Sequence, residues 1–480
     1  MLELTLADVI EGLTGWHPSA LTQPISDVHM DSRQVIHGGL FFALRGEQLD
    51  GHDYMPQALS QGCRAVVAER PPESGCIVVD TTDAAGFQAR AGHLLATPPE
   101  QPLCLLVSDS LGALQQLADF WRTRHAARVV GVTGSVGKTT TKEIIAAVLG
   151  QRFRVLKSEK SVNTATGLPL TLLRLTTAHE RVVLEFGGGY QLGEIARLAH
   201  IARPQVGVVT NVGPSHLERM GTIERIALNK AELVASLPED GVAILNIDDP
   251  LVRDMAPKAR GRVFFYGLTP EADLWADEIQ SQGLEGLRFR FHYGEETLHA
   301  KVSLLGRHSV HTALRAAAAG LVEGLSWQEI MNGLRGANQL RLVVVPGFNG
   351  STLLDDTYNS SPASAIAALN LLEELEGRKI AVLGDMLELG SYEDEAHRKV
   401  GRRAVDVVQL LVTVGPRGRI IGQEALALGM APQAVEMVDD NQAAIDYLRQ
   451  AILAHDVILI KGSRGLTMEQ IVNALAVPKN

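Results

Sequence analysis

The stretch "ARVVGVTGSVGKTTTKEIIAAVLG", residues 127–150, decides the fold of the region around it. An apolar run leads into glycines spaced three apart, Gly134 and Gly137, and then into a lysine, three threonines and a helical pattern. Strand, glycine-rich turn and helix in this order are typical of a phosphate-binding loop. The strict motif is not met, because residues 132–136 place one residue too many between Gly131 and Gly137. The tighter core "TGSVGKTT" still keeps the residues that the chemistry needs.

The chemistry of this loop favours a bound nucleoside triphosphate. Glycines let backbone N–H groups turn inward, and a helix that opens at Lys138 directs its positive end at the phosphates. Lys138 would neutralise the β- and γ-phosphates, and Thr139 could give its hydroxyl to Mg²⁺. The residues expected to bind the nucleotide are Gly134, Ser135, Val136, Gly137, Lys138, Thr139 and Thr140. The alternative, a turn that binds nothing, does not explain why glycine, lysine and threonine stand in register here.

A second stretch bears on whether ATP or GTP is bound. "NKAE", residues 229–232, superficially resembles the motif by which GTPases read guanine. It falls inside the helical pattern "IERIALNKAELVASL" rather than at the exit of a strand, so guanine specificity is not expected.

Length and composition indicate a globular chain of roughly two to four domains, with 480 residues of which 46% are hydrophobic and 21% charged. The net charge of −11 argues against nucleic acid or an anionic membrane as the main partner. No apolar run is long enough to span a bilayer, and "MLELTLADVIEGL" carries acids where a secretory signal needs a basic start, so a cytoplasmic location is expected. Cys63, Cys76 and Cys104 form no CxxC pair, which argues against a zinc cluster or a disulfide framework.

Three regions differ in pattern, and each predicts a domain. Residues 1–105 hold short strands such as "GLFFALRG" and "CRAVVAE", which predict a small mixed domain with a proline-rich, loop-rich end. Residues 106–335 alternate apolar strands ("RVVLEFGGG", "QVGVVTNVG", "GVAILNIDD", "RVFFYG") with helices, which predicts a central parallel sheet of the P-loop ATPase type. Residues 336–480 repeat this alternation in "TLLDDTYN", "KIAVLGDM", "LLVTVG" and "DVILIKGS", and predict a Rossmann-like, doubly wound domain. The expected fold class is therefore α/β in three domains.

Motifs along the chain carry a family resemblance. "TGSVGKTTTKE", "LEFGGGYQLGEI", "NVGPSHLERMG", "ALNKAEL" and "LNIDDP" resemble the Mur ligases in order and spacing. "DSRQVIHGGLFFALRGEQLDGHDYMPQAL", "DDTYNSSPASAIAAL", "AVLGDMLELG" and "IKGSRG" are similar to the family member that joins D-alanyl-D-alanine to UDP-MurNAc-tripeptide. The resemblance covers the chain except residues 71–103. It implies a monomeric, ATP- and Mg²⁺-dependent amide ligase of peptidoglycan precursor synthesis, whose N-terminal domain binds the UDP end of a small-molecule substrate.

The resemblance also implies roles for residues around the loop. Lys138 would contact the phosphates, while Thr139, Glu185 and His216 would serve the metal ions. The lysine that matches Lys230 is carbamylated by CO₂ in this family, and the carbamate supports a Mg²⁺ ion. Glu185 closes "VVLEF" and His216 follows "VGVVTNVG", so both are expected beyond the carboxyl ends of strands, where ligands bind in open α/β sheets.

Further binding residues are implied in the same way. His308, Arg341, Asp356 and Asn359 would complete the nucleotide site, Ser32, Arg33 and Asn163 would hold the UDP-sugar peptide, and Lys461, Ser463 and Arg464 would face the acceptor. Without the resemblance, an Asx-rich turn would be an equally good interpretation of "DDTYN". "GDMLELG" marks the family, but its spacing indicates no chemistry.

Three positions depart from the family pattern. Thr164 and Thr312 stand where the family usually has asparagine, and residues 188–190 in "EFGGGY" lack the usual bulkier side chains. These departures bear on contacts with the peptide and the adenine more than on the ATP-dependent step.

Two other functions stay open on the sequence alone. Another ligase of the superfamily, adding a different amino acid or dipeptide, would share the central motifs but should lack the first region's "DSR" and "DGHDYM". A phosphate-loop switch would use nucleotide to control partner affinity and would hydrolyse it slowly without an amine. That interpretation leaves Glu185, His216 and Lys230 unexplained.

Overall fold

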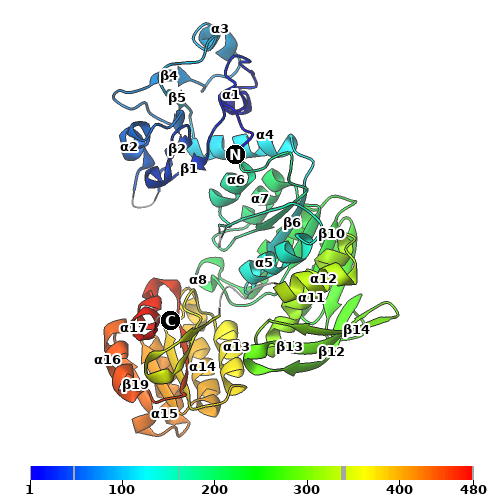
Figure 1. The fold of residues 1–480 in the computed structure, drawn as a ribbon, viewed down its shortest axis with the longest axis vertical. Coiled ribbons are helices and arrows are strands. Elements are labelled where there is room, and N and C mark those ends of the chain that lie inside the picture. The colour runs from blue at the N-terminus through cyan, green and yellow to red at the C-terminus, as the bar shows by residue number, and fades with distance from the viewer. Residues whose placement is uncertain (1, 47–48, 160–161, 337–341, 478–480) are drawn as a thin grey trace. The chain divides into compact units, whose positions relative to one another are not determined.

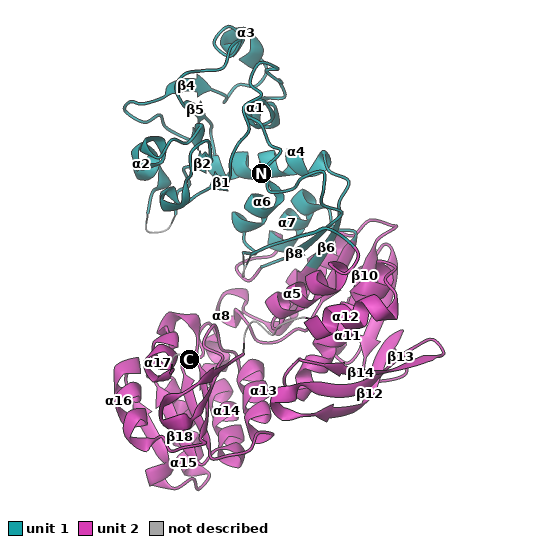
Figure 2. Ribbon diagram, in the orientation of Figure 1, with its two compact units in different colours: residues 1–131, 153–187, 194–205 teal, residues 132–152, 188–193, 206–480 magenta. Residues whose placement is uncertain are grey.

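The computed structural model describes residues 2–46, 49–159, 162–336 and 342–477 (Figure 1). It divides into two compact units, shown in Figure 2: the first contains residues 1–131, 153–187 and 194–205, and the second contains residues 132–152, 188–193 and 206–480. The predicted domain boundaries near 105 and 335 stay a prediction. Among the described residues, no helix combines the length and the apolar character needed to cross a membrane.

The first unit begins with a five-stranded parallel sheet. Its strands lie in the order β1-β2-β3-β5-β4. The elements of this part are β1 (Val28–His29), β2 (Leu40–Phe42), β3 (Ala65–Ala68), β4 (Ile77–Asp80), β5 (Leu103–Leu106), α1 (Leu6–Thr14), α2 (Met55–Ser60), α3 (Phe87–Ala91) and α4 (Ser110–Thr123). The predicted strands "GLFFALRG" and "CRAVVAE" are confirmed as β2 and β3. The proline-rich stretch 71–103 is more than the expected loop, because β4 within it pairs with β5 and completes the sheet.

The first unit also contains elements from the middle of the chain. Strand β7 (Val155–Lys157) pairs in parallel with β8 (Arg181–Glu185). Helices α6 (Gly167–Leu172) and α7 (Glu194–Ala202) belong to the same unit and pack with α4. Strand β8 is the predicted "RVVLE" strand, and it ends at the glutamate that the sequence singled out.

The second unit continues from β6 (Arg128–Thr133), whose residues the unit boundary divides. Six strands of this unit are neighbours in one sheet, in the order β14-β13-β12-β11-β10-β9. Neighbouring strands are parallel from β9 to β12 and antiparallel from β12 to β14. Its strands are β9 (Val206–Val209), β10 (Val242–Asn246), β11 (Arg262–Gly267), β12 (Leu274–Ser281), β13 (Leu287–Tyr293) and β14 (Glu296–Val302). Its helices are α5 (Lys138–Leu149), α8 (Leu217–Met220), α9 (Ile223–Ala235), α10 (Pro250–Arg253), α11 (Val310–Val322) and α12 (Trp327–Gly336). The parallel strands were predicted, and the antiparallel extension was not.

A six-stranded sheet ends the chain, in the order β15-β16-β20-β17-β18-β19. Only the edge strand β15 is antiparallel. The strands are β15 (Val343–Pro346), β16 (Thr352–Asp355), β17 (Lys379–Gly384), β18 (Leu410–Val414), β19 (Val435–Val438) and β20 (Val457–Lys461). The helices are α13 (Pro362–Glu373), α14 (Glu393–Val407), α15 (Gly418–Ala427), α16 (Asn441–Ala451) and α17 (Glu469–Leu475).

Both faces of this last sheet are buried. On β17, Ala381 and Leu383 belong to one buried cluster, whereas Ile380 and Val382 belong to another. Alternate residues of a strand point to opposite faces, so each face packs against its own apolar layer. This is the doubly wound arrangement that the run of apolar strands predicted.

One buried side chain ties the C-terminal end of α4 to α7 in the first unit. Arg122 is 5% exposed and donates hydrogen bonds to the carbonyl oxygens of Ala202 (2.9 Å), His125 (2.7 Å) and Ala127 (2.9 Å). We expect Arg122→Met to destabilise the chain by about 3 kcal/mol, because three buried carbonyls lose a charged donor. The urea-unfolding midpoint should fall accordingly.

The matched control is Arg124→Met. Arg124 is 40% exposed and pairs with Asp8 and Glu11, so its loss should cost less than about 1 kcal/mol. Equal midpoints for the two variants would contradict the structural role given to Arg122.

Candidate active site

The phosphate loop joins β6 to α5 in a conformation that only glycine can adopt at two positions. Gly134 and Gly137 have positive φ angles of 138° and 84°. A Cβ on Gly134 would lie 1.9 Å from the hydroxyl oxygen of Thr210, so a side chain is excluded there. Helix α5 starts with Gly137 as its N-cap, and no side chain caps this end. An uncapped helix N-terminus at the end of a glycine loop is suited to a phosphate.

The residues that follow β9 hold the loop in place. Val136 donates its N–H to the side-chain oxygen of Asn211 (2.9 Å), and its carbonyl accepts from the Asn211 amide (3.0 Å) and the Thr210 hydroxyl (2.7 Å). The Ser135 hydroxyl donates to the carbonyl of Gly213 at 3.0 Å. Sequence reasoning gave Thr210 and Asn211 no role, although Asn211 opens the quoted motif "NVGPSHLERMG" and Thr210 directly precedes it. A polar pair at the exit of the neighbouring strand was the available signal.

Lys138 and Thr139 occupy the first turn of α5. The Lys138 ammonium donates to the carbonyl oxygens of Gly134 (2.8 Å) and Ser135 (3.2 Å), so the side chain folds back over the loop. Thr139 is 5% exposed, which places its hydroxyl at the base of the loop. A γ-phosphate would give the ammonium a charged acceptor, and the hydroxyl is a suitable oxygen ligand for Mg²⁺.

His216 lies at the N-terminus of α8, with φ 56°. Its Nδ1 lies 2.5 Å from Glu388, a residue of the "GDMLELG" motif. Burial lowers the pKa of His216 despite the opposing effect of Glu388, and the positive charges of Lys138 and Lys230 lower it further. The structure therefore brings together three of the predicted catalytic residues, and burial favours the neutral form of the imidazole, which is the form that binds a metal.

Lys230 lies on α9 and is only 2% exposed. Its amine donates to the carbonyl of Gly188 at 2.5 Å and to the side-chain oxygen of Asn229 at 3.1 Å. Such burial is unusual for lysine. The "NKAE" stretch thus lies within a helix, as the periodicity predicted, and presents its lysine to the interior.

The departure at residues 188–190 has a steric reason. A Cβ on Gly189 would lie 2.6 Å from the ring of His216, so any larger residue would displace the imidazole. Tyr190 is 60% exposed, and the guanidinium of Arg219 stacks 3.9 Å from the centre of its ring. The glycines therefore let this loop approach His216 closely.

In the first unit, Glu185 and Asn163 form a second predicted group. Glu185 is 1% exposed at the end of β8, and its Oε1 accepts from the Asn163 amide at 2.7 Å. Asn163 thus orients a buried carboxylate, which suits a metal ligand. The nearby departure Thr164 accepts from the N–H of Gly167 at 3.2 Å, a local turn bond that asparagine could also make.

The two residues predicted to bind substrate in the first domain, Ser32 and Arg33, differ in their exposure to solvent. The Ser32 hydroxyl is buried and donates to Gln57 at 2.7 Å. Arg33 has an 81% exposed side chain and pairs with Asp31 at 2.7 Å. Their roles toward the UDP end stay predictions.

Residues predicted from the third region gather at the carboxyl ends of β16 and β20. The buried ammonium of Lys461 lies 2.6 Å from Asp356 and donates to the carbonyl of Asn359 at 2.8 Å. The Ser463 hydroxyl accepts from the N–H of Leu387 at 2.9 Å. The guanidinium of Arg464 lies 5.1 Å from the ring centre of Tyr358.

The other two predicted nucleotide residues are His308 and Arg341. His308 is exposed, yet the protein around its ring desolvates it and lowers its pKa to about 4, an effect that the charge of Arg315 reinforces. Its ring is therefore neutral at physiological pH. Arg341 lies outside the described residues.

The structure explains the "GDMLELG" motif, which the sequence left without chemistry. Asp385 accepts the N–H groups of Arg417 (2.9 Å) and Gly418 (2.7 Å), and so caps α15. His397, which is fully buried, accepts the N–H of Met386 at 3.0 Å, while its Nδ1 lies 2.7 Å from the carbonyl of Glu393. These bonds fix the loop that carries the glutamate paired with His216.

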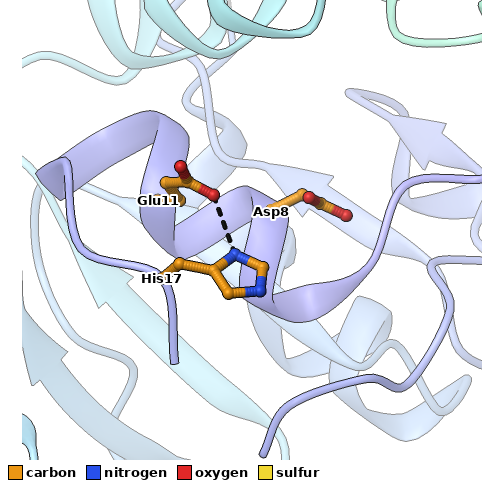
Figure 3. A group of neighbouring side chains, drawn as sticks. All are labelled: Asp8, Glu11 and His17. Atoms are coloured by element: carbon orange, nitrogen blue, oxygen red, sulfur yellow. Dashed lines mark hydrogen bonds and ion pairs between the residues drawn. The ribbon is translucent and has the colours of Figure 1, made fainter. Parts of the chain in front are cut away.

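Among the described residues, the first unit also holds a cluster of possible metal ligands. Asp8, Glu11 and His17 lie close together on and beside α1 (Figure 3). Arg124 donates to both carboxylates, at 3.2 Å and 2.7 Å, and Glu11 also binds His17. The negative charge is already compensated, so we interpret the cluster as an ion-pair network.

Three family models match the chain. They are the Mur ligase middle domain over residues 132–320, the Mur ligase glutamate ligase domain over residues 340–464, and the Mur ligase family catalytic domain over residues 24–96. Together they cover parts of all three predicted regions.

Curated relatives and solved structures match nearly the whole chain. UDP-N-acetylmuramoyl-tripeptide–D-alanyl-D-alanine ligase is 35% identical in Bacillus subtilis and 32% in Escherichia coli K12, with 99% of each chain covered. MurF from Acinetobacter baumannii superposes with a TM-score of 0.83 at 27% identity, with 98% of both chains covered. MurF from Thermotoga maritima in complex with ADP gives a TM-score of 0.76 at 28% identity, with 93% and 96% covered.

The burial of His397 makes the stability of the folded chain depend on pH. Burial lowers the pKa of His397, so below about pH 6.5 the unfolded chain takes up a proton that the folded chain resists. Stability should therefore fall as the pH falls. We expect His397→Gln to have a lower thermal midpoint at pH 7.5 and a smaller further decrease between pH 7.5 and 5.

The control for this measurement is His17→Gln, which removes a histidine with a 45% exposed side chain. It should leave the thermal midpoint at pH 7.5 close to that of the parent chain, because an exposed ion pair contributes little to stability. A His397→Gln profile parallel to the parent profile would contradict the assignment.

Proposed function

We propose that this chain, which belongs to the Mur ligase family, joins D-alanyl-D-alanine to UDP-MurNAc-tripeptide at the expense of ATP in peptidoglycan precursor synthesis. Relatives named for this ligation match it from end to end. A MurF that binds ADP has the same fold. The observation that carries the proposal is a phosphate loop with Lys138, His216 and a buried Lys230 beside it. The alternative function, a nucleotide-dependent switch, does not explain why this lysine is buried beside the loop.

The reaction has two steps. A carboxylate of the tripeptide attacks the γ-phosphorus of ATP, and ADP leaves with the electrons of the broken P–O bond. The amine of D-alanyl-D-alanine then attacks the acyl phosphate, phosphate leaves with the electrons of the C–O bond, and the nitrogen loses a proton. The first step brings anions together, so fixed positive charges beside the phosphates are required.

Residues of the central region meet this requirement. Lys138 binds the β- and γ-phosphates together with the N–H groups of the loop. Thr139, Glu185 and His216 would hold magnesium ions through a hydroxyl, a carboxylate and an imidazole, and a carbamate on Lys230 would add an oxygen ligand. When bound, Mg²⁺ offsets the phosphate charge. The orientation of Glu185 by Asn163 supports its assignment.

The remaining residues complete the substrate sites. His308, Arg341, Asp356 and Asn359 contact the nucleotide, Ser32, Arg33 and Asn163 hold the UDP-sugar peptide, and Lys461, Ser463 and Arg464 face the dipeptide. We assign these roles to three domains with boundaries near residues 105 and 335. Closure of the domains over the substrates would exclude water, which would otherwise hydrolyse the acyl phosphate.

The same proposal covers partners and location. The enzyme acts as a cytoplasmic monomer on small molecules, without nucleic acid. The net charge of −11 supports the absence of a nucleic-acid partner.

The first test is phosphate release by the purified chain with Mg²⁺, ATP and UDP-MurNAc-tripeptide, with and without D-alanyl-D-alanine. We expect release only with both substrates, a UDP-MurNAc-pentapeptide product by mass, and a loss of at least about a hundredfold in Lys138→Ala. Release that ignores the dipeptide and yields no amide would rule the ligase out.

The carbamate on Lys230 has a direct spectroscopic test. With ¹³C-bicarbonate we expect a ¹³C carbamate signal from the parent chain that Lys230→Arg lacks, together with a large loss of kcat. Lys142→Arg is the matched control, because Lys142 is also fully buried and pairs with Glu143 at 3.0 Å. A signal that survives in Lys230→Arg would place the modification elsewhere.

A further inference from the structure

A buried arginine lies behind the phosphate loop and has no part in the reaction described so far. Arg315, on α11, is 4% exposed. It donates from Nη2 to the Thr312 hydroxyl at 2.7 Å and from Nη1 to the carbonyl of Thr210 at 3.4 Å. Its Nε is buried and has no hydrogen-bond partner among the described residues. The guanidinium carbon also lies 6.0 Å from the ring centre of Tyr266, but Nε is left without a hydrogen bond.

The charge of Arg315 is also uncompensated. No carboxylate oxygen of the described chain lies within the 4.0 Å of an ion pair with it. Two other buried cations of this unit do have such a partner: Lys461 pairs with Asp356 at 2.6 Å and Lys142 pairs with Glu143 at 3.0 Å. A buried cation without an anion destabilises a fold unless a ligand provides the missing charge.

The guanidinium lies directly against the loop. A Cβ on Gly137, the N-cap of α5, would be 3.6 Å from Nη2 of Arg315. Nη1 reaches Thr210, whose hydroxyl holds Val136. Arg315 thus contacts the two structures that shape the loop, and its positive charge adds to that of the helix N-terminus.

We infer that Arg315 is a positioning residue for the nucleotide: its buried charge lies behind the loop and is balanced when the polyphosphate binds in front. The inference rests on the proposed nucleotide site. It also gives the threonine at the departure position 312 a role, because its hydroxyl accepts the hydrogen bond of Arg315. A charge in this place distinguishes ligands by their number of phosphates.

Calorimetric titration of Arg315→Met with Mg-ATP, Mg-ADP and AMP, without peptide substrates, tests the inference. We expect a roughly tenfold weaker affinity for ATP, a smaller loss for ADP and the smallest for AMP. The thermal midpoint without nucleotide should stay unchanged or rise, because the variant removes an uncompensated buried charge. Arg315→Lys should retain most of the ATP affinity.

Two variants serve as controls. Arg307→Met removes an exposed positive charge just before α11 and should alter neither affinity nor midpoint. Arg122→Met removes a buried arginine whose bonds are satisfied, and should lower the midpoint without changing affinity.

The possible results distinguish a failure of the role given to Arg315 from a failure of the proposed ligase function. An Arg315→Met chain that loses stability as Arg122→Met does, yet binds ATP normally, would show a purely structural residue. Equal losses for ATP and AMP would also overturn the inference. A parent chain that binds no nucleotide would overturn the proposed function itself.

Discussion

The hydrogen bonds between the phosphate loop and the exit of β9 are the constraint on which the active site depends. Thr210 and Asn211 bind both backbone groups of Val136, and the Thr210 hydroxyl occupies the space that a side chain at position 134 would need. The loop is therefore shaped before any ligand arrives, so binding does not have to order it. The start of α5, and with it Lys138, follows from this one contact between neighbouring strand exits.

Local signals explain what the sequence could predict. Apolar runs and glycines mark β6, β9, β17 and β20, and the register of Gly137 and Lys138 marks the loop, because these features depend on adjacent residues only. The antiparallel strands β12 to β14 were missed. They alternate buried and exposed residues over half-buried faces, so they lack the apolar runs of the parallel strands.

The contacts missed at the site join residues distant in sequence. Asp385 caps a helix more than thirty positions away, at Gly418, and His397 reaches back to Met386. Gly189 was noticed as a departure, but its reason, the ring of His216, is visible only in space. Periodicity and spacing carry no information about such pairs, whereas the family motifs marked the segments in which they lie.

The position of strand β20 in its sheet affects how the chain folds during synthesis on the ribosome. Among the described residues it is the strand furthest along the sequence, yet it lies between β16 and β17 inside its sheet, and it supplies Lys461. While translation proceeds, β16 and β17 have no common neighbour, and their edges are open until residues 457–461 emerge. This sheet can therefore be completed only after residues 457–461 have been made. A stop codon before residue 457 would leave a nascent chain without the strand that joins β16 to β17, and such a chain is a substrate for chaperones and proteases.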